Sequence, residues 1–212
     1  MTLCMGNGKV RGILFDLDGT LLDSFPSHFE AYRVMFARYR IEISEESFLA
    51  AYSPNWYHTY EALGLPGEVW EEANSHWVEA AAALPPLPFP GAAETLEALG
   101  SSYELGVVTS GSRGRVLRDL ERTGIGRFFR VVVTGDDVRE PKPAPEGLEL
   151  GLARMGLSPG EAVYVGDAHA DYEMARAAGV EFLGIPSSFA SLKGDHPCRK
   201  VLSITDLVEV FK

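Results

Sequence analysis

The sequence predicts an α/β protein: a doubly wound parallel sheet into which a helical second domain is inserted. Short apolar runs recur along the chain, and helical patterns separate most of them. The long stretch between the first two runs has no strand signal at all. Continuous apolar runs are typical of strands covered on both faces, and alternation with helices is typical of right-handed βαβ units.

The core elements follow from these runs. The predicted strands are residues 13–15, 105–109, 131–133, 162–165 and 182–185. The predicted helices between them are residues 113–123, 144–155 and 169–178. Because the runs are apolar throughout rather than alternating, we expect both faces of the sheet to be buried.

The interrupting stretch predicts a separate helical domain. Its helical patterns cover residues 27–39, 44–51, 57–63 and 67–83, and Ser27 with Glu30 makes a capping box for the first. Residues 84–91 are rich in proline, which is typical of a stiff linker. We therefore expect an α/β catalytic core of residues 1–23 and 89–212 and a helical domain of residues 24–88.

Composition limits the partners. The 212-residue chain has a net charge of −11, which disfavours sequence-independent binding to nucleic acid and docking on anionic membrane. A small anionic ligand remains compatible, provided that a metal and one or two cations lie at its site. Two cysteines far apart in sequence, no signal peptide and no long apolar run predict a cytoplasmic protein.

Two acids follow the first predicted strand directly. Asp16 and Asp18 come after residues 13–15, and ligands of open α/β sheets bind beyond the carboxyl ends of the strands. Close carboxylates repel each other, and a divalent cation relieves the repulsion. The alternative is that these acids merely cap a turn, because Asp-Gly is a turn dipeptide.

Polar residues also follow three later strands. Thr109 and Ser110 precede a helix, where hydroxyl and free N–H groups make an anion seat. Lys142 lies between two prolines in a chain that prefers arginine, and its compact charge suits a phosphate. Asp167 ends another strand, and Asp171 lies one helical turn later. Helix capping, or a solvated loop for the lysine, remains the alternative at each position.

Taken together, these motifs resemble the haloacid dehalogenase (HAD) superfamily. The most specific stretch is Asp-Leu-Asp-Gly-Thr at residues 16–20, and the lysine and later acids follow in the family's order. The inserted helices and the Pro90-Gly91 pair resemble the α-helical-cap subgroup, which includes phosphoglycolate phosphatases. The resemblance implies a Rossmann-like core with a cap domain and covers nearly the whole chain.

The resemblance also implies roles for the two acids of the motif. Asp16 would be the nucleophile that forms an aspartyl-phosphate, and Asp18 would be the general acid and base. Mg²⁺ would bind the Asp16 carboxylate, the Asp18 backbone carbonyl and the Asp167 carboxylate. An aspartate at position 18 favours phosphate esters over carbon–halogen bonds, because an alcohol leaving group needs a proton.

Other positions take roles from the same resemblance. Thr109 would bind the transferring phosphoryl group, Lys142 would balance its charge, and Asp171 would orient Lys142 or a metal-bound water. Gly19, Thr20 and Ser110 would line the phosphate site. Ser110 departs from the asparagine that is frequent there, which puts only a substrate contact in question.

The expected activity is therefore Mg²⁺-dependent hydrolysis of a small phosphate monoester from a phosphorylated metabolite. A sugar-phosphate mutase is the nearest alternative, and a phospho-accepting receiver domain is the non-enzymatic one. In the cap, Asn55, Tyr57 and His58 are predicted to reach the substrate, unless they only pack against or cap the next helix. The absence of lysine and arginine from residues 53–59 counts against a mutase.

Overall fold

The computed structural model describes residues 9–53, 56–187 and 198–212. Contacts divide the chain into two compact units: a larger one of Met1–Asp23 and Leu87–Lys212, and a smaller one of Ser24–Pro86. Among the described residues, no helix is long and apolar enough to cross a membrane.

The larger unit is built on a six-stranded sheet with the order β5-β4-β1-β6-β7-β8, in which every pair is parallel. The strands are β1 (Gly12–Phe15), β4 (Glu104–Val108), β5 (Val131–Val133), β6 (Ala162–Gly166), β7 (Glu181–Gly184) and β8 (Arg199–Lys200). The predicted doubly wound α/β core is confirmed. Strand β8 was not predicted, because its two basic residues give no apolar signal.

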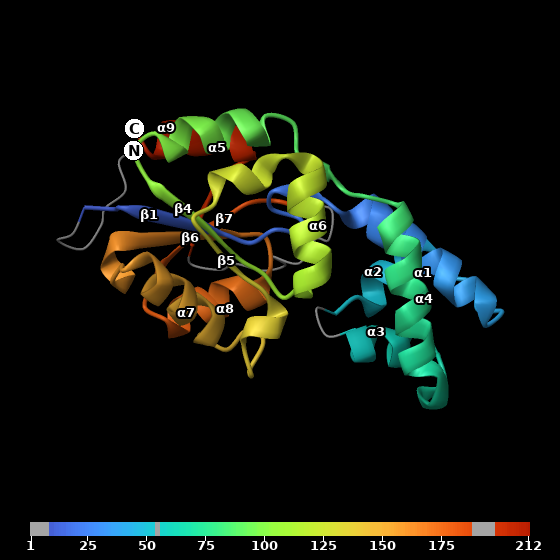
Figure 1. The fold of residues 1–212 in the computed structure, drawn as a ribbon. Helices are drawn as coiled ribbons and strands as arrows, with labels where there is room; N and C mark the ends of the chain where they lie inside the picture. The colour runs from blue at the N-terminus through green and yellow to red at the C-terminus, as the bar shows by residue number, and fades with distance from the viewer. Residues whose placement is uncertain (1–8, 54–55, 188–197) are drawn as a thin grey trace. The chain divides into compact units, whose positions relative to one another are not determined.

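Helices cover both faces of this sheet (Figure 1). Helices α5 (Ala92–Gly100), α6 (Arg113–Thr123) and α9 (Leu207–Val210) pack in one apolar cluster, and α7 (Glu146–Met155) and α8 (His169–Ala177) pack in the other. Short 3-10 turns lie at Ile125–Phe128, Gly135–Asp137, Pro159–Glu161 and Ile204–Asp206. Because strand side chains alternate, Ile13 and Phe15 belong to the first cluster and Leu14 to the second.

Strand β1 marks the point where the winding direction reverses. The chain continues from β1 to β4 and β5 on one side, and returns to β6 and β7 on the other. Phe15 is in register with Val107 and Val165, and the next amide, of Asp16, donates to the Val165 carbonyl at 2.8 Å. The residues after these three strands therefore meet at one edge of the sheet, where ligands bind in such folds.

The smaller unit is helical. It contains α1 (Phe25–Arg38), α2 (Glu45–Ala51), α3 (Trp56–Ala62), a 3-10 turn at Gly67–Val69 and α4 (Trp70–Ala83). Its interior is aromatic: Tyr32 and Phe36 of α1 meet Phe48 and Tyr60 from the neighbouring helices at ring-centre distances of 4.9 to 6.0 Å. The side chains of Tyr32 and Phe36 thus face the core of this unit.

The start of α1 differs from the prediction. The helix begins at Phe25, and the Ser27 hydroxyl donates to the Ser24 carbonyl at 3.0 Å instead of capping the helix with Glu30. The predicted capping box is wrong, because the fixed backbone of Pro26 fits the first helical turn and lets the helix start earlier. Within the larger unit, the chain before α1 and the chain after α4 pair as the short antiparallel strands β2 (Leu22–Asp23) and β3 (Leu87–Pro88).

A buried carboxylate holds the connection from β5. Asp137 accepts bonds from the amide and hydroxyl of Thr134 at 2.9 and 2.7 Å, and from the guanidinium groups of Arg113 and Arg154 at 2.5 and 3.1 Å. Burial alone would raise the pKa of Asp137, but these bonds outweigh it and hold the pKa below the ordinary value. The charged form of Asp137 therefore stabilises the folded state at neutral pH.

Candidate active site

Asp16 lies at the centre of the carboxyl edge of the sheet. It is the first residue after β1 and is only 7% exposed. Lys142, in the loop between β5 and α7, donates from Nζ to Asp16 Oδ1 at 2.6 Å, and its side chain is 8% exposed. The lysine between two prolines thus meets the acid after the first strand, although 126 residues separate them.

Lys142 has two further partners. Its Nζ donates to Asp171 Oδ1 and to Tyr164 Oη, each at 2.7 Å. The Tyr164 hydroxyl donates to the carbonyl of Val108 at 2.8 Å, which links the lysine to the end of β4. The lysine ammonium therefore has a fixed position, with a partner for each of its three protons.

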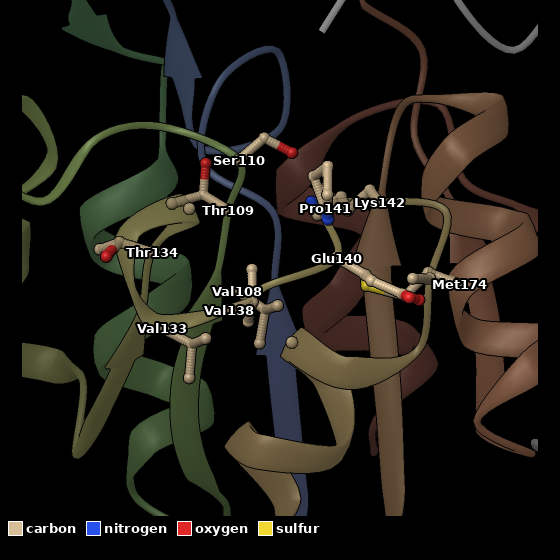
Figure 2. A pocket seen from close by; sticks show the side chains of 13 residues that line it. Val108, Thr109, Ser110, Val133, Thr134, Val138, Glu140, Pro141, Lys142 and Met174 are labelled. Carbon is tan, nitrogen blue, oxygen red and sulfur yellow. The ribbon is translucent and has the colours of Figure 1, made fainter. Parts of the chain in front are cut away.

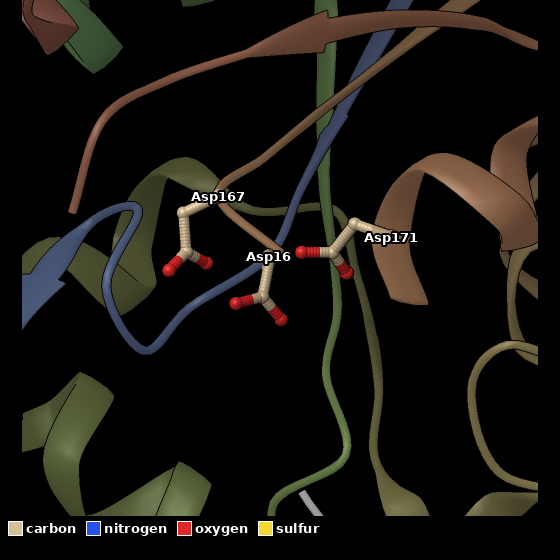
Figure 3. A group of neighbouring side chains, drawn as sticks. All are labelled: Asp16, Asp167 and Asp171. Atoms are coloured by element: carbon tan, nitrogen blue, oxygen red, sulfur yellow. The ribbon is translucent and has the colours of Figure 1, made fainter. Parts of the chain in front are cut away.

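Asp167 completes a group of three buried acids. Single carboxylate oxygens of Asp16, Asp167 and Asp171 lie within 4.8 Å of one another, and Figure 3 shows the three groups converging. Asp167 accepts from the hydroxyl of Thr20 at 3.4 Å and from the hydroxyl of Ser187. Three carboxylates beside one lysine leave an excess of negative charge, which suits a divalent metal with oxygen ligands.

Burial and charge shift the pKa values at this edge. Burial raises the pKa of Asp16 well above its usual range, and the nearby Asp171 and Asp167 add to the rise while Lys142 opposes it. Burial alone would lower the pKa of Lys142, but the carboxylates of Asp16 and Asp171 outweigh it and raise the pKa. Lys142 is therefore cationic, and additional positive charge would keep Asp16 ionised.

Thr109 and Ser110 follow β4, and they share a small pocket with Lys142 (Figure 2). The wall also includes Val108, Thr134 and the first residues of the loop that carries the lysine. Thr109 is 5% exposed, and its hydroxyl accepts from the amide of Gly111 at 3.3 Å. Both predicted hydroxyl residues thus border the same hollow as the lysine.

Asp18 is oriented differently from Asp16. Strand β1 ends at Phe15, and the chain turns through Gly19, whose φ of +81° suits glycine and whose amide donates to the Leu22 carbonyl at 2.8 Å. Both carboxylate oxygens of Asp18 accept from Arg115 of α6, at 3.1 and 2.5 Å. The structure therefore places Asp18 beside an arginine and outside the group of three acids.

The three residues predicted to reach the substrate from the cap have different surroundings, as far as the structure describes them. Asn55 lies outside the described residues. Tyr57 stacks on Trp56 at 3.7 Å and donates to Glu71 at 3.2 Å, both within the helical unit. His58 is exposed. Packing accounts for the observed contacts of Tyr57, and a substrate contact for any of the three stays a prediction.

Three residues of this site were not predicted: Arg115, Tyr164 and Ser187. A tyrosine inside an otherwise aliphatic buried strand is a usable signal, because its hydroxyl needs a partner. Arg115 and Ser187 give no such signal. Arg115 lies 97 residues from Asp18 and Ser187 lies 20 residues from Asp167, and no local sequence pattern connects either pair.

Comparison with known proteins identifies the family to which the chain belongs. A family model of the haloacid dehalogenase-like hydrolases matches residues 13–185, which is most of the chain. The chain belongs to this family and is an enzyme, a hydrolase.

Individual relatives show which members of this family the chain resembles. Pyrophosphatase PpaX of Bacillus velezensis is 36% identical over 217 residues, covering 97% of this chain and 98% of that protein. Phosphoglycolate phosphatase of Salmonella paratyphi A is 29% identical over 208 residues, covering 84% and 81%. A subfamily IA hydrolase structure from Geobacter sulfurreducens matches with a TM-score of 0.73 at 27% identity over both whole chains. The chain is therefore similar to the phosphatases of the family.

Proposed function

We propose that this chain is a Mg²⁺-dependent phosphatase that hydrolyses a small phosphate monoester through an aspartyl-phosphate on Asp16. The observation that carries the proposal is the buried Asp16 carboxylate at the switch point of the sheet, with Lys142 bound to one of its oxygens. Phosphoryl transfer needs mainly positioned groups and neutralised charge, which this arrangement supplies.

The first half of the reaction uses Asp16 as the nucleophile. Its carboxylate oxygen bonds to phosphorus while the bond between phosphorus and the leaving oxygen breaks. Lys142 holds the other oxygen of Asp16 at 2.6 Å and adds positive charge beside the phosphoryl group. Thr109 and the amides that follow it at the end of β4 bind the phosphoryl oxygens.

Asp18 moves the protons. Asp18 enters the cycle protonated: in the first half-reaction it gives this proton to the leaving oxygen, and in the second it regains one from the attacking water. The water oxygen then bonds to phosphorus, the bond to Asp16 breaks, and inorganic phosphate leaves. Both carboxylates return to their starting state, so the cycle balances.

A divalent cation fits the same edge. Asp16, Asp167 and the backbone carbonyl of Asp18 would hold Mg²⁺, while Asp171 holds Lys142 at 2.7 Å. The bound ion would supply charge neutralisation for three carboxylates that otherwise repel one another. The Thr20 and Ser187 hydroxyls orient Asp167 for this task.

The proposed substrate is a small phosphorylated metabolite. The relatives named above act, by their names, on pyrophosphate and on phosphoglycolate, and both are small anions with a terminal phosphate. A net charge of −11 and widely spaced cysteines support a cytoplasmic enzyme that works on a soluble metabolite. The receiver-domain alternative does not hold, because the chain belongs to a hydrolase family.

Phosphate release from a panel of phosphate esters, with pyrophosphate added as an anhydride, tests the proposal. The panel contains p-nitrophenyl phosphate, phosphoglycolate, pyrophosphate and a hexose phosphate, each assayed with Mg²⁺ and with EDTA. The variants are Asp16→Asn and, as a matched control, Glu97→Gln at an exposed position of α5. We expect Mg²⁺-dependent release that Asp16→Asn abolishes and Glu97→Gln preserves.

Two results would contradict the proposal. Equal release by Asp16→Asn would exclude Asp16 as the nucleophile. Transfer of the phosphoryl group between sugar phosphates, without net release of phosphate, would instead support the mutase alternative.

A further inference from the structure

The phosphate loop, residues 109–112 after β4, is held by a second loop that has no part in the proposed chemistry. This second loop is the 3-10 turn Gly135–Asp137, which follows β5. The two loops leave the sheet side by side, because the Thr109 amide donates to the Val133 carbonyl at 3.0 Å. The turn therefore lies directly beside the residues that are proposed to bind the phosphoryl group.

Gly135 contacts the backbone of the phosphate loop. Its amide donates to the Gly111 carbonyl at 2.9 Å. A Cβ at Gly135 would lie 2.5 Å from the Ser110 carbonyl oxygen and 3.2 Å from the carbonyl carbon. Because both atoms belong to the backbone, no side-chain rotation could relieve this contact. Glycine therefore allows the two loops to approach more closely than any other residue would.

These contacts determine the direction of two amides in the phosphate loop. In a planar trans peptide, a carbonyl and the amide that follows it point to opposite sides. The Ser110 carbonyl lies against Gly135, so the Gly111 amide points away from the turn, and it donates to the Thr109 hydroxyl at 3.3 Å. By the same geometry, the bond from Gly135 to the Gly111 carbonyl turns the Ser112 amide away from Gly135.

The same turn also fixes the start of α6. Asp136 accepts from the Arg113 amide at 2.8 Å, so its carboxylate caps the first residue of the helix. The Arg113 guanidinium donates to Asp137 Oδ1 at 2.5 Å, and Asp137 in turn is bonded to Thr134. The end of the phosphate loop is therefore attached to the turn through both backbone and side-chain groups.

We propose that Gly135 and Asp136 are positioning residues that orient the amides of the phosphate loop toward the phosphoryl group of the substrate. The inference rests on the proposed function, in which Thr109 and the amides after it bind the phosphoryl oxygens. Both residues act through the backbone of the phosphate loop and do not touch the substrate. Donors that are already oriented stabilise a phosphoryl group best, because they need no reorganisation when charge develops on it.

Binding of inorganic phosphate tests the inference. Calorimetric titration in the presence of Mg²⁺ gives the Kd of phosphate, and a thermal-shift titration gives the Kd of Mg²⁺ separately. We expect Gly135→Ala to bind phosphate about 10- to 100-fold more weakly, because hydrogen bonds to a charged group are lost. The Kd of Mg²⁺ should stay unchanged, because its proposed ligands belong to neither loop. The control is Gly114→Ala on α6, where a Cβ meets no atom within 4 Å and phosphate binding should match the wild type.

Two substitutions of Asp136 separate its hydrogen bond from its charge, and they decide the question if Gly135→Ala does not fold. Asp136 is exposed, so both variants should fold. Asparagine keeps an oxygen that accepts from the Arg113 amide and removes a negative charge, so Asp136→Asn should bind phosphate at least as tightly as the wild type. Asp136→Ala loses the bond and should bind phosphate about two- to tenfold more weakly than Asp136→Asn.

Three outcomes would overturn the inference while the proposed phosphatase stands. One is wild-type phosphate affinity in a folded Gly135→Ala enzyme. Another is an equal loss of Mg²⁺ and phosphate binding in that variant, which indicates a general structural role. The third is equal phosphate affinity in Asp136→Asn and Asp136→Ala. A wild-type enzyme that binds phosphate with Mg²⁺ but hydrolyses no ester would instead contradict the proposed function itself.

Discussion

Adding one methyl group at Gly166 tests how closely the site is packed. Gly166 ends β6, and an ideal Cβ there would lie 2.6 Å from Asp171 Oδ2, 2.7 Å from its Cγ and 2.8 Å from its Cβ. Rotating the Asp171 side chain about its Cα–Cβ bond would relieve only the first two contacts. Because the third is to the Cβ that α8 carries, Gly166→Ala must shift the helix or the strand end.

The expected magnitude follows from what Asp171 holds. Overpacking of this kind costs about 1–3 kcal/mol of folding stability, which a domain with about 5–15 kcal/mol tolerates. Asp171 also fixes Lys142 at 2.7 Å, and a misplacement of about 1 Å in a catalytic group lowers the rate about 100-fold. We therefore expect a folded Gly166→Ala enzyme whose kcat is about 10- to 100-fold lower.

The assay measures kcat for p-nitrophenyl phosphate together with urea unfolding. Gly160→Ala is the matched control, because a Cβ at Gly160 meets no atom within 4 Å. Wild-type kcat in Gly166→Ala would refute the reasoning that Asp171 sets the position of Lys142. A similar loss of kcat in Gly160→Ala would show that the assay responds to any added methyl group.

Three further predictions concern single groups. Tyr164→Phe removes a partner of Lys142 and leaves a buried carbonyl unpaired, so it should lower the free energy of unfolding by about 1–3 kcal/mol; urea unfolding that matches the wild type would contradict this. Asp137→Asn should destabilise at pH 7 by about 2 kcal/mol. Because the folded-state pKa of Asp137 lies below its ordinary value of 3.8, this difference should shrink as the pH falls below that value, whereas a constant difference between pH 7 and pH 3 would exclude the assigned charge effect. Mg²⁺ at about 100 times its dissociation constant should stabilise the wild type by about 2.7 kcal/mol, and a thermal shift of equal size in Asp167→Asn would exclude Asp167 as a ligand.

The core of the fold and the residues at its strand ends could be predicted because both depend on local signals. Apolar runs give strands, and in parallel strands the next residues must share one edge. Asp16, Lys142, Asp167 and Asp171 could therefore be expected at one place before their distances were known. Strand β8 gave no such signal, because its two residues, Arg199 and Lys200, are basic rather than apolar.

Contacts that depend on side-chain direction could not be predicted. Arg115 lies 97 residues from Asp18, and only the packing of α6 against the sheet brings the two together. Ser27 and Glu30 have the spacing of a capping box. Pro26 fits the first helical turn, however, and the helix begins earlier, at Phe25. The type and spacing of residues in the sequence indicate which side-chain contacts and helix caps are possible. The packing of the folded chain decides which of them form.

The central claim is that Asp16 carries the phosphoryl group, and trapping that group tests it most directly. In the Asp18→Asn variant, Asp16 should still accept the phosphoryl group from p-nitrophenyl phosphate, because this leaving group needs no proton. The variant should hydrolyse the aspartyl-phosphate slowly, because it lacks the base that takes a proton from water. Rapid mixing followed by acid quench and peptide mass spectrometry should then show a burst of p-nitrophenolate stoichiometric with enzyme and a phosphoryl group on Asp16. A burst with the phosphoryl group on another residue, or with none on the protein, would contradict the account.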